Sequence, residues 1–163
     1  MSYLVDGNNV MAQRVGWHRD KAGARRALLD EVARFAEIKD VRVGVVFDGA
    51  PDKHFADGSS YRGVRVFYAE RGSNADERIK AMVEEARERR TLMVVTSDRS
   101  LGNYVRRCGA RVLRAGEFRR RMEDALAQAG DEHERDAGPD VAAGEMNGWM
   151  RYFGVGPDDD DDD

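Results

Sequence analysis

The stretch YLVDGNNV, residues 3–10, sets the pattern for the whole chain. A short apolar run ends in an acid, a glycine and two amides, and the chain then turns apolar again. These residue types are common in turns, because Asp and Asn side chains hydrogen-bond the nearby backbone and Gly accepts unusual dihedral angles. The stretch is therefore either an ordinary turn after a buried strand or the first part of an active site.

Further apolar runs typical of buried strands mostly alternate with helical patterns along the chain. Strands are predicted at residues 3–5, 41–47, 64–68, 92–96 and 110–113, and helices at 21–38, 75–89, 99–107 and 117–129. Residues 49–62 contain Pro, Gly and Ser without periodicity, which predicts a loop. This alternation favours a single α/β domain, with a parallel sheet of about five strands flanked by helices.

The composition changes after residue 129. Residues 1–129 form the predicted domain, and residues 130–143 are a polar linker. Apolar residues at helical spacing in 144–154 predict an amphipathic helix that packs on the domain, or on a partner. Residues 155–163 end in consecutive aspartates and predict a disordered acidic tail, which is inert, regulatory or an artificial extension.

Charge is distributed unevenly along the chain. Residues 1–121 hold 25 Lys and Arg against 17 Asp and Glu, whereas residues 122–163 hold 2 against 14. A basic, arginine-rich body can attract nucleic acid, although codon usage explains the arginines equally well. The single cysteine, Cys108, excludes an internal disulfide and favours a cytoplasmic protein, and no apolar stretch has the length of a membrane span.

Four acids come after four of the predicted strands. Asp6, Asp48 and Asp98 follow the first, second and fourth strands, and Asp76 lies in the first turn of the helix after the third. Since the carboxyl ends of parallel strands meet at one edge, these acids are expected to converge. Each also has a structural explanation: Asp6 and Asp48 suit turns, Asp98 suits a helix cap, and Asp76 suits a capping box with Ser73.

Convergent carboxylates repel one another, and a divalent cation relieves that repulsion. Mg²⁺ and Mn²⁺ prefer oxygen ligands, and such an ion can activate water and neutralise charge on a phosphodiester. Acids and arginines together therefore indicate a metal-dependent nuclease. The rivals are a non-catalytic RNA-binding domain of the same fold and a phosphatase or receiver-like protein. The sequence lacks the D-x-D pair and the suitably placed lysine that a phosphatase or receiver-like protein would have.

The stretches LVDGNNV, VVFDGAP, GVRVFYAERGSNADERI and VVTSDRSL resemble, in order and spacing, the YacP-like branch of the NYN domains, which are relatives of PIN-domain nucleases. The resemblance covers residues 3–122, and GEMNGWMRYFG resembles the helix that closes these proteins. It implies a sheet ordered 3-2-1-4-5 and Mg²⁺- or Mn²⁺-dependent endonucleolytic cleavage of single-stranded RNA, in RNA processing or decay. It leaves open whether that RNA is free or is ribosome-associated mRNA.

Carried over position by position, the resemblance implies that Asp6, Asp76 and Asp98 are catalytic acids and metal ligands. Asp48 matches the acid after the second strand and would be an outer ligand of the metal. Some wider relatives carry a further acid where Gly102 stands here, which argues against a second tightly held metal.

The resemblance also assigns polar neighbours to this acidic centre. Asn9 matches an amide that orients a water or phosphate and counts with the catalytic residues, while Asn8 is left to make the turn. Thr96 and Ser97 could hydrogen-bond the centre or substrate. Several arginines flank the proposed site in sequence and could bind phosphate, although solvated surface charge explains each equally well: Arg62, Arg65, Arg71, Arg78 and Arg99.

Overall fold

The computed structural model describes residues 1–69 and 73–133, the last three of them by their backbone only. The predicted C-terminal helix, the acidic tail and Arg71 lie outside these residues, as does most of the predicted linker. In this part of the chain, no helix is both long enough and apolar enough to cross a membrane.

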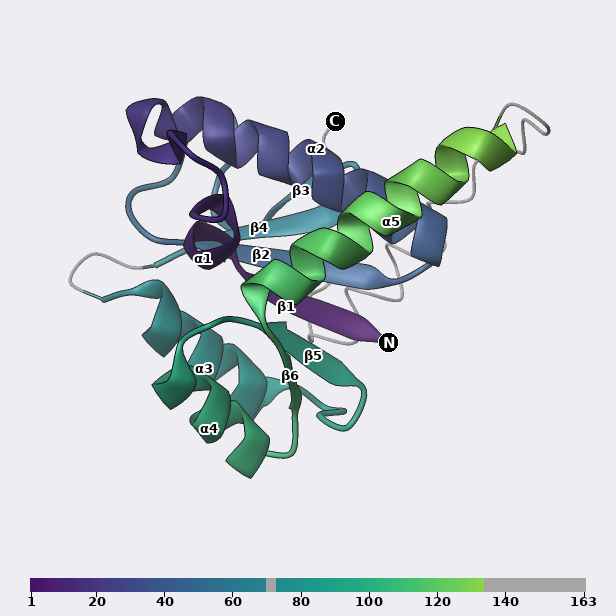
Figure 1. The fold of residues 1–163 in the computed structure, drawn as a ribbon. Helices are drawn as coiled ribbons and strands as arrows, with labels where there is room; N and C mark the ends of the chain where they lie inside the picture. Colours follow the sequence, from purple (N-terminus) through teal and green to yellow (C-terminus); the bar gives the residue numbers. More distant parts are fainter. Residues whose placement is uncertain (70–72, 134–163) are drawn as a thin grey trace.

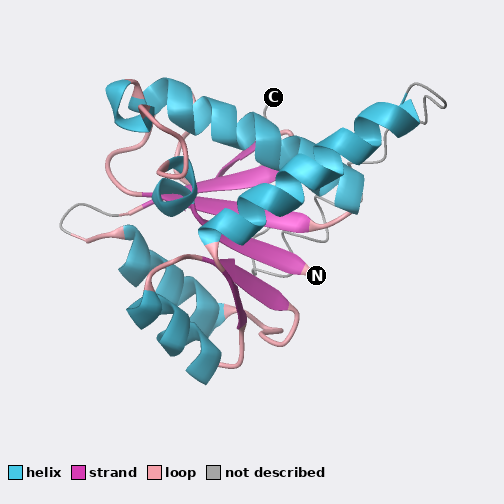
Figure 2. Ribbon diagram, viewed as in Figure 1, coloured by secondary structure: helices cyan, strands magenta, loops and turns pink. Residues whose placement is uncertain are grey.

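Six strands form one sheet in the order β3-β4-β2-β1-β5-β6 (Figures 1 and 2). All neighbouring strands are parallel except β3 and β4, which are antiparallel. The parallel strands confirm the predicted order 3-2-1-4-5, and their carboxyl ends share one edge of the sheet. The strands are β1 (Ser2–Asp6), β2 (Arg42–Phe47), β3 (Ser59–Tyr61), β4 (Val64–Tyr68), β5 (Leu92–Val95) and β6 (Arg111–Leu113).

Helices cover both faces of this sheet. The helices α2 (Lys21–Lys39) and α5 (Ala115–His133) cover one face, and α3 (Ala75–Glu85) and α4 (Arg99–Arg107) cover the other (Figure 1). Every residue of β1 is buried, because successive side chains of a strand point to opposite faces and both faces are covered. A continuous apolar run, without alternation, is the sequence pattern that this position requires.

Each face has its own hydrophobic core. Tyr3 of β1 packs against Phe35 of α2 and Phe118 of α5, with ring centroids 5.6 and 5.7 Å away. Leu4, the next residue, lies in the second core with Ile79 of α3. The central strand is therefore held from both sides, and its carboxyl end is fixed in space.

The predicted loop at residues 49–62 contains a strand, β3, which is a correction to the sequence-based assignment. β3 and β4 are joined by Arg62 and Gly63, whose φ angles of 49° and 88° suit the tight two-residue hairpins that match strand twist. Three residues are too few to show an alternating pattern, so the strand was not visible in the sequence.

Helix boundaries also differ from the predictions. The short helices α1 (Gly7–Met11) and η1 (Trp17–Arg19) were not predicted, and α1 begins directly where β1 ends. The helix predicted at residues 75–89 ends at Glu85, because the backbone of Ala86 is extended and Arg89 Nη2 donates to the carbonyl of Glu84 at 2.7 Å. α5 continues to His133, past the predicted start of the linker.

Candidate active site

Asp6 is the last residue of β1 and lies at the centre of the carboxyl edge, where only 3% of its surface is exposed. Its Oδ2 accepts a hydrogen bond from Thr96 Oγ1 at 3.1 Å. Thr96 directly follows β5, and its hydroxyl oxygen in turn accepts the backbone N–H of Asp98 at 3.1 Å. One buried hydroxyl therefore joins two of the predicted acids.

The environment of Asp6 opposes its ionisation. Burial raises the pKa of this carboxyl to about 7, and the negative charges of Asp76 and Asp48 contribute to the rise. Hydrogen bonds from Thr96 and from the backbone of Asn9 act in the opposite direction. Asp6 can therefore gain or lose a proton near neutral pH, which an exposed aspartate does not do.

Asp76 joins this electrostatic cluster from the start of α3. Burial is the largest effect that raises its pKa, the charges of Asp98 and Asp48 raise it further, and the charge of Lys80 lowers it. Asp76 thus interacts electrostatically with Asp6, Asp48 and Asp98, as convergence of the four acids predicts.

The capping-box explanation of Asp76 is wrong. The N-cap of α3 is Asn74, whose side chain accepts the backbone N–H of Glu77 at 3.0 Å. Asp76 therefore stands one residue before the position that a capping box would use. The helix start is satisfied without Asp76, and its carboxylate is left to the acidic cluster.

Asp48 positions α3 directly. Its Oδ1 accepts the backbone N–H of Ala75, the first residue of α3, at 2.7 Å. Arg25 holds the same loop by donating to the carbonyl of Asp48 at 2.6 Å. Asp48 thereby carries a structural role beside its charge, since it connects the end of β2 to the helix turn that bears Asp76.

The two amides of the opening motif bind different strands. Asn8 Oδ1 accepts the backbone N–H of Asp48 at 3.0 Å, and Asn9 Oδ1 accepts that of Ser97 at 2.7 Å. Asn8 was expected only to shape a turn, but it holds the end of β2. Asn9 binds the loop after β5, next to the acids.

Asp98 has its predicted structural role, and its charge also contributes to the acidic cluster. As the N-cap of α4, it accepts the backbone N–H of Leu101 at 3.0 Å, which confirms the structural explanation. Its charge also raises the pKa of Asp76. Ser97 beside it is exposed, and its Oγ accepts the N–H of Ala115 at 3.1 Å, which ties this loop to the start of α5.

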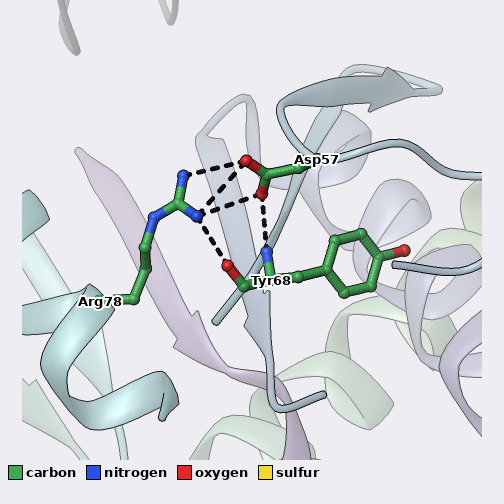
Figure 3. Close-up of polar contacts among 3 residues, drawn as sticks. All are labelled: Asp57, Tyr68 and Arg78. Atoms are coloured by element: carbon green, nitrogen blue, oxygen red, sulfur yellow. Dashed lines mark hydrogen bonds and ion pairs between the residues drawn. The ribbon is translucent and has the colours of Figure 1, made fainter. Parts of the chain in front are cut away.

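Three of the predicted phosphate-binding arginines do not present a free guanidinium at this edge. Arg62 and Arg65 lie at the amino end of β4, the opposite edge of the sheet; Arg62 pairs with acids of α2 and Arg65 is 3% exposed. Arg78 donates to Asp57 at 3.2 Å and to the carbonyl of Tyr68 at 2.6 Å (Figure 3). These predictions are corrected, because sequence proximity to an acid does not give proximity in the fold.

Arg99 does lie beside the acids. With Thr96, Ser97 and Asp98 it lines a surface cavity of about 230 Å³ between α4 and the end of β6. The same cavity is lined by Arg106 and Arg114, which sequence reasoning missed. Both had a signal: Arg106 is seven residues after Arg99 on one helix face, and Arg114 directly follows β6, as the acids follow their strands.

The donor chemistry of the cluster suits a hard divalent cation, since carboxylate and hydroxyl oxygens from Asp6, Asp76, Asp98 and Thr96 are the atoms present. Burial is the main cause of the raised pKa values of Asp6 and Asp76, and the charges of neighbouring acids raise them further. Within residues 1–69 and 73–133, however, no three His, Cys, Asp or Glu side chains already converge into a set that could hold a metal ion.

The protein is an α/β domain with a mostly parallel sheet whose acids meet at one edge, and its match to a family model places it in the PIN-like nuclease class. The chain belongs to the YacP-like NYN domain family, whose model matches residues 3–143. This is a family of PIN-like nucleases, and it gives the protein an RNA-related, nuclease-like function.

Solved structures agree with the fold. The crystal structure of Rae1 (YacP) from Bacillus subtilis matches this fold with a TM-score of 0.67. The two sequences are 25% identical, and the match covers 83% of this chain and 80% of that one. A mutant of the same protein gives 24% identity and a TM-score of 0.67 over 90% of both chains. A comparison with curated proteins found no match.

Proposed function

We propose that the protein is a Mg²⁺- or Mn²⁺-dependent endoribonuclease that hydrolyses phosphodiester bonds of single-stranded RNA in the cytoplasm, in RNA processing or decay. One observation carries the proposal. Asp6, Asp76 and Asp98 come from three separate elements, and Asp76 interacts electrostatically with both of the others. Membership of a family of PIN-like nucleases supports it.

In this proposal Asp6, Asp76 and Asp98 would hold the cation. The ion would neutralise charge on the scissile phosphate and activate an attacking water. Asp48 would act outside the ligand set, through its hydrogen bond to the first residue of α3. Thr96 would orient Asp6 through its hydroxyl, and Asn9 would hold the loop that carries Ser97 and Asp98.

In the absence of a bound cation, the carboxyl of Asp6 has a pKa of about 7. Near neutral pH a proton therefore competes with a cation for the oxygen atoms of this carboxyl. We therefore expect metal-dependent activity to rise as the pH increases, and the midpoint of the rise to move below about 7 as the metal concentration is raised, because the deprotonated carboxylate is the form that binds a cation.

The test is cleavage of an unstructured RNA by the Asp6→Asn, Asp76→Asn double variant in Mg²⁺ and in Mn²⁺. We expect cleavage to be lost while the circular dichroism spectrum and RNA binding in EDTA are retained. Cleavage that survives in the folded double variant rules the proposal out. The alternative, a non-catalytic RNA-binding domain with this fold, predicts that the wild-type protein binds RNA without turnover at any metal concentration.

A further inference from the structure

We propose that the cavity between α4 and β6 is a binding site for a backbone phosphate of single-stranded RNA, next to the acidic centre, with Arg106 and Arg114 as its principal ligands. This inference rests on the proposed function for the identity of the RNA. It adds a second, basic part to the site, which would hold the strand beside the bond to be cleaved.

The lining of the cavity is positively charged. Three arginines line it, Arg99, Arg106 and Arg114, against a single acid, Asp98. All three arginines are exposed, and none forms an ion pair within the described ranges of the chain. Among the described residues, the side chain of Arg106 hydrogen-bonds the side-chain oxygen of Asn103, at 3.5 Å, and most of its donors are left available.

The cavity lies directly beside the acidic centre. Thr96, Ser97 and Asp98 form one of its walls, and Thr96 and Asp98 belong to the acidic centre. A cluster of acids repels the polyanion that it has to cleave. Unpaired arginines directly beside the acids offset this repulsion, and their planar forks suit phosphate oxygens.

The size of the cavity restricts the ligand. A volume of about 230 Å³ is several times the ~30 Å³ that a water molecule occupies in the liquid. It is also below the ~300–1,000 Å³ of pockets that enclose a drug-sized molecule. The cavity is therefore large enough for a phosphate with part of its sugar, as one unit of a longer strand.

Gly102 keeps this cavity open. A Cβ atom at residue 102 would lie 3.6 Å from Val112 Cγ1 and 4.0 Å from Arg106 Nη1, which is ordinary contact. Alanine therefore fits there, whereas a longer side chain would extend over the cavity beside Arg106. This gives a way to block the cavity without removing any arginine.

The experiment measures binding of a fluorescein-labelled oligouridylate of about 12 nucleotides by fluorescence anisotropy, in EDTA and over a series of KCl concentrations. The variants are Arg106→Ala with Arg114→Ala, and Gly102→Leu. The matched controls are Arg34→Ala with Arg90→Ala, which removes the same charge from exposed positions on α2 and before β5, and Gly102→Ala.

We expect the double arginine variant to raise the Kd about tenfold or more at low salt, and to reduce the slope of log K against log[KCl] by about 1.4, for two lost contacts to a single strand. Gly102→Leu should also raise the Kd, whereas Gly102→Ala should bind as the wild type does. The control pair Arg34→Ala with Arg90→Ala should change the Kd much less than the double arginine variant. The inference is overturned if the double arginine variant binds as its control pair does, or if Gly102→Leu binds as Gly102→Ala does.

The two proposals can fail separately. If the wild type cleaves RNA with metal and the cavity variants bind RNA normally, the phosphate site is wrong and the nuclease assignment stands. If the cavity variants lose RNA binding in EDTA while no metal supports cleavage by the wild type, the phosphate site stands and the nuclease assignment is wrong.

Discussion

Asn8 and Asn9 are adjacent in the sequence, yet their side chains bind the ends of strands on opposite sides of β1. Asn8 accepts the N–H of Asp48, after β2, and Asn9 accepts the N–H of Ser97, after β5. Since β1 lies between β2 and β5, one short helix fastens both neighbours of the central strand. The acids that follow those strands are thereby held at one edge.

This arrangement predicts that each asparagine protects a different backbone amide from hydrogen exchange. Asn8→Ala should increase hydrogen exchange at the amide of Asp48 and leave Ser97 unchanged, and Asn9→Ala should do the reverse. Each change leaves a backbone donor without its acceptor, at a cost of about 1 kcal/mol of unfolding free energy. Each variant is the control for the other, and equal exchange at both amides in either variant would contradict the two-strand arrangement.

Asp48 should affect stability through its hydrogen bond and the pKa values of its neighbours through its charge, and two variants distinguish these effects. Asp48→Asn keeps an oxygen for the N–H of Ala75 but removes a charge, so it should lower the pKa values of Asp6 and Asp76 at little cost in stability. Asp48→Ala also loses the acceptor and should cost about 1–2 kcal/mol. NMR titration of the carboxyl carbons and urea unfolding measure both effects, and equal unfolding midpoints for the two variants would exclude the positional role.

Asp6 should make stability depend on pH. Its pKa is raised from 3.8 to about 7 on folding, so the folded state binds the proton more tightly and loses stability as the pH rises between these values. Asp6→Asn removes this loss while its amide oxygen can still accept from Thr96. In EDTA the variant should therefore gain about 2–4 kcal/mol over the wild type as the pH rises from about 4 to about 7. A difference that is independent of pH would show that Asp6 titrates as an exposed acid.

Gly7 should be required for packing rather than for chemistry. A Cβ atom there would lie 2.6 Å from Phe47 Cδ1 and Cε1 and 3.0 Å from Val45 Cγ1, in a core that cannot yield without moving a buried ring. Gly7→Ala should cost about 1–3 kcal/mol by overpacking. Gly102→Ala, where the new Cβ atom meets only ordinary contacts, is the control and should be neutral or stabilising in thermal unfolding.

Arg78 should act through Asp57 rather than on RNA. Asp57 also accepts the backbone N–H of Tyr68 at 2.9 Å, so this group links β4 to α3 (Figure 3). A double-mutant cycle with Arg78→Ala and Asp57→Asn should give a coupling of less than about 1 kcal/mol, because Asp57 is half-exposed. RNA affinity in EDTA should fall no further in Arg78→Ala than in Arg34→Ala, and a larger fall would restore Arg78 as a phosphate ligand.

The alternation of strands and helices was predictable from the sequence, because it depends on local periodicity. The sheet order and the placement of acids after the strands came from the resemblance and from that same alternation. The hairpin strand β3 and the helix α1 were missed, since three and five residues are too few to show a period. The end of α3 was missed because Arg89, which lies inside the predicted helix, instead donates its side chain to the carbonyl of Glu84.

The sequence by itself determined the α/β class, the family and the four candidate acids, all of which can be read from patterns within short windows of the chain. Only the tertiary structure decided that Asp76 is freed from capping by Asn74, that Asn8 and Asn9 hold different strands, and that Arg78 is engaged by Asp57. It also placed Arg106 and Arg114 beside Asp98. The physical reason is that these contacts depend on which strands are neighbours and where each helix begins, and local periodicity contains neither.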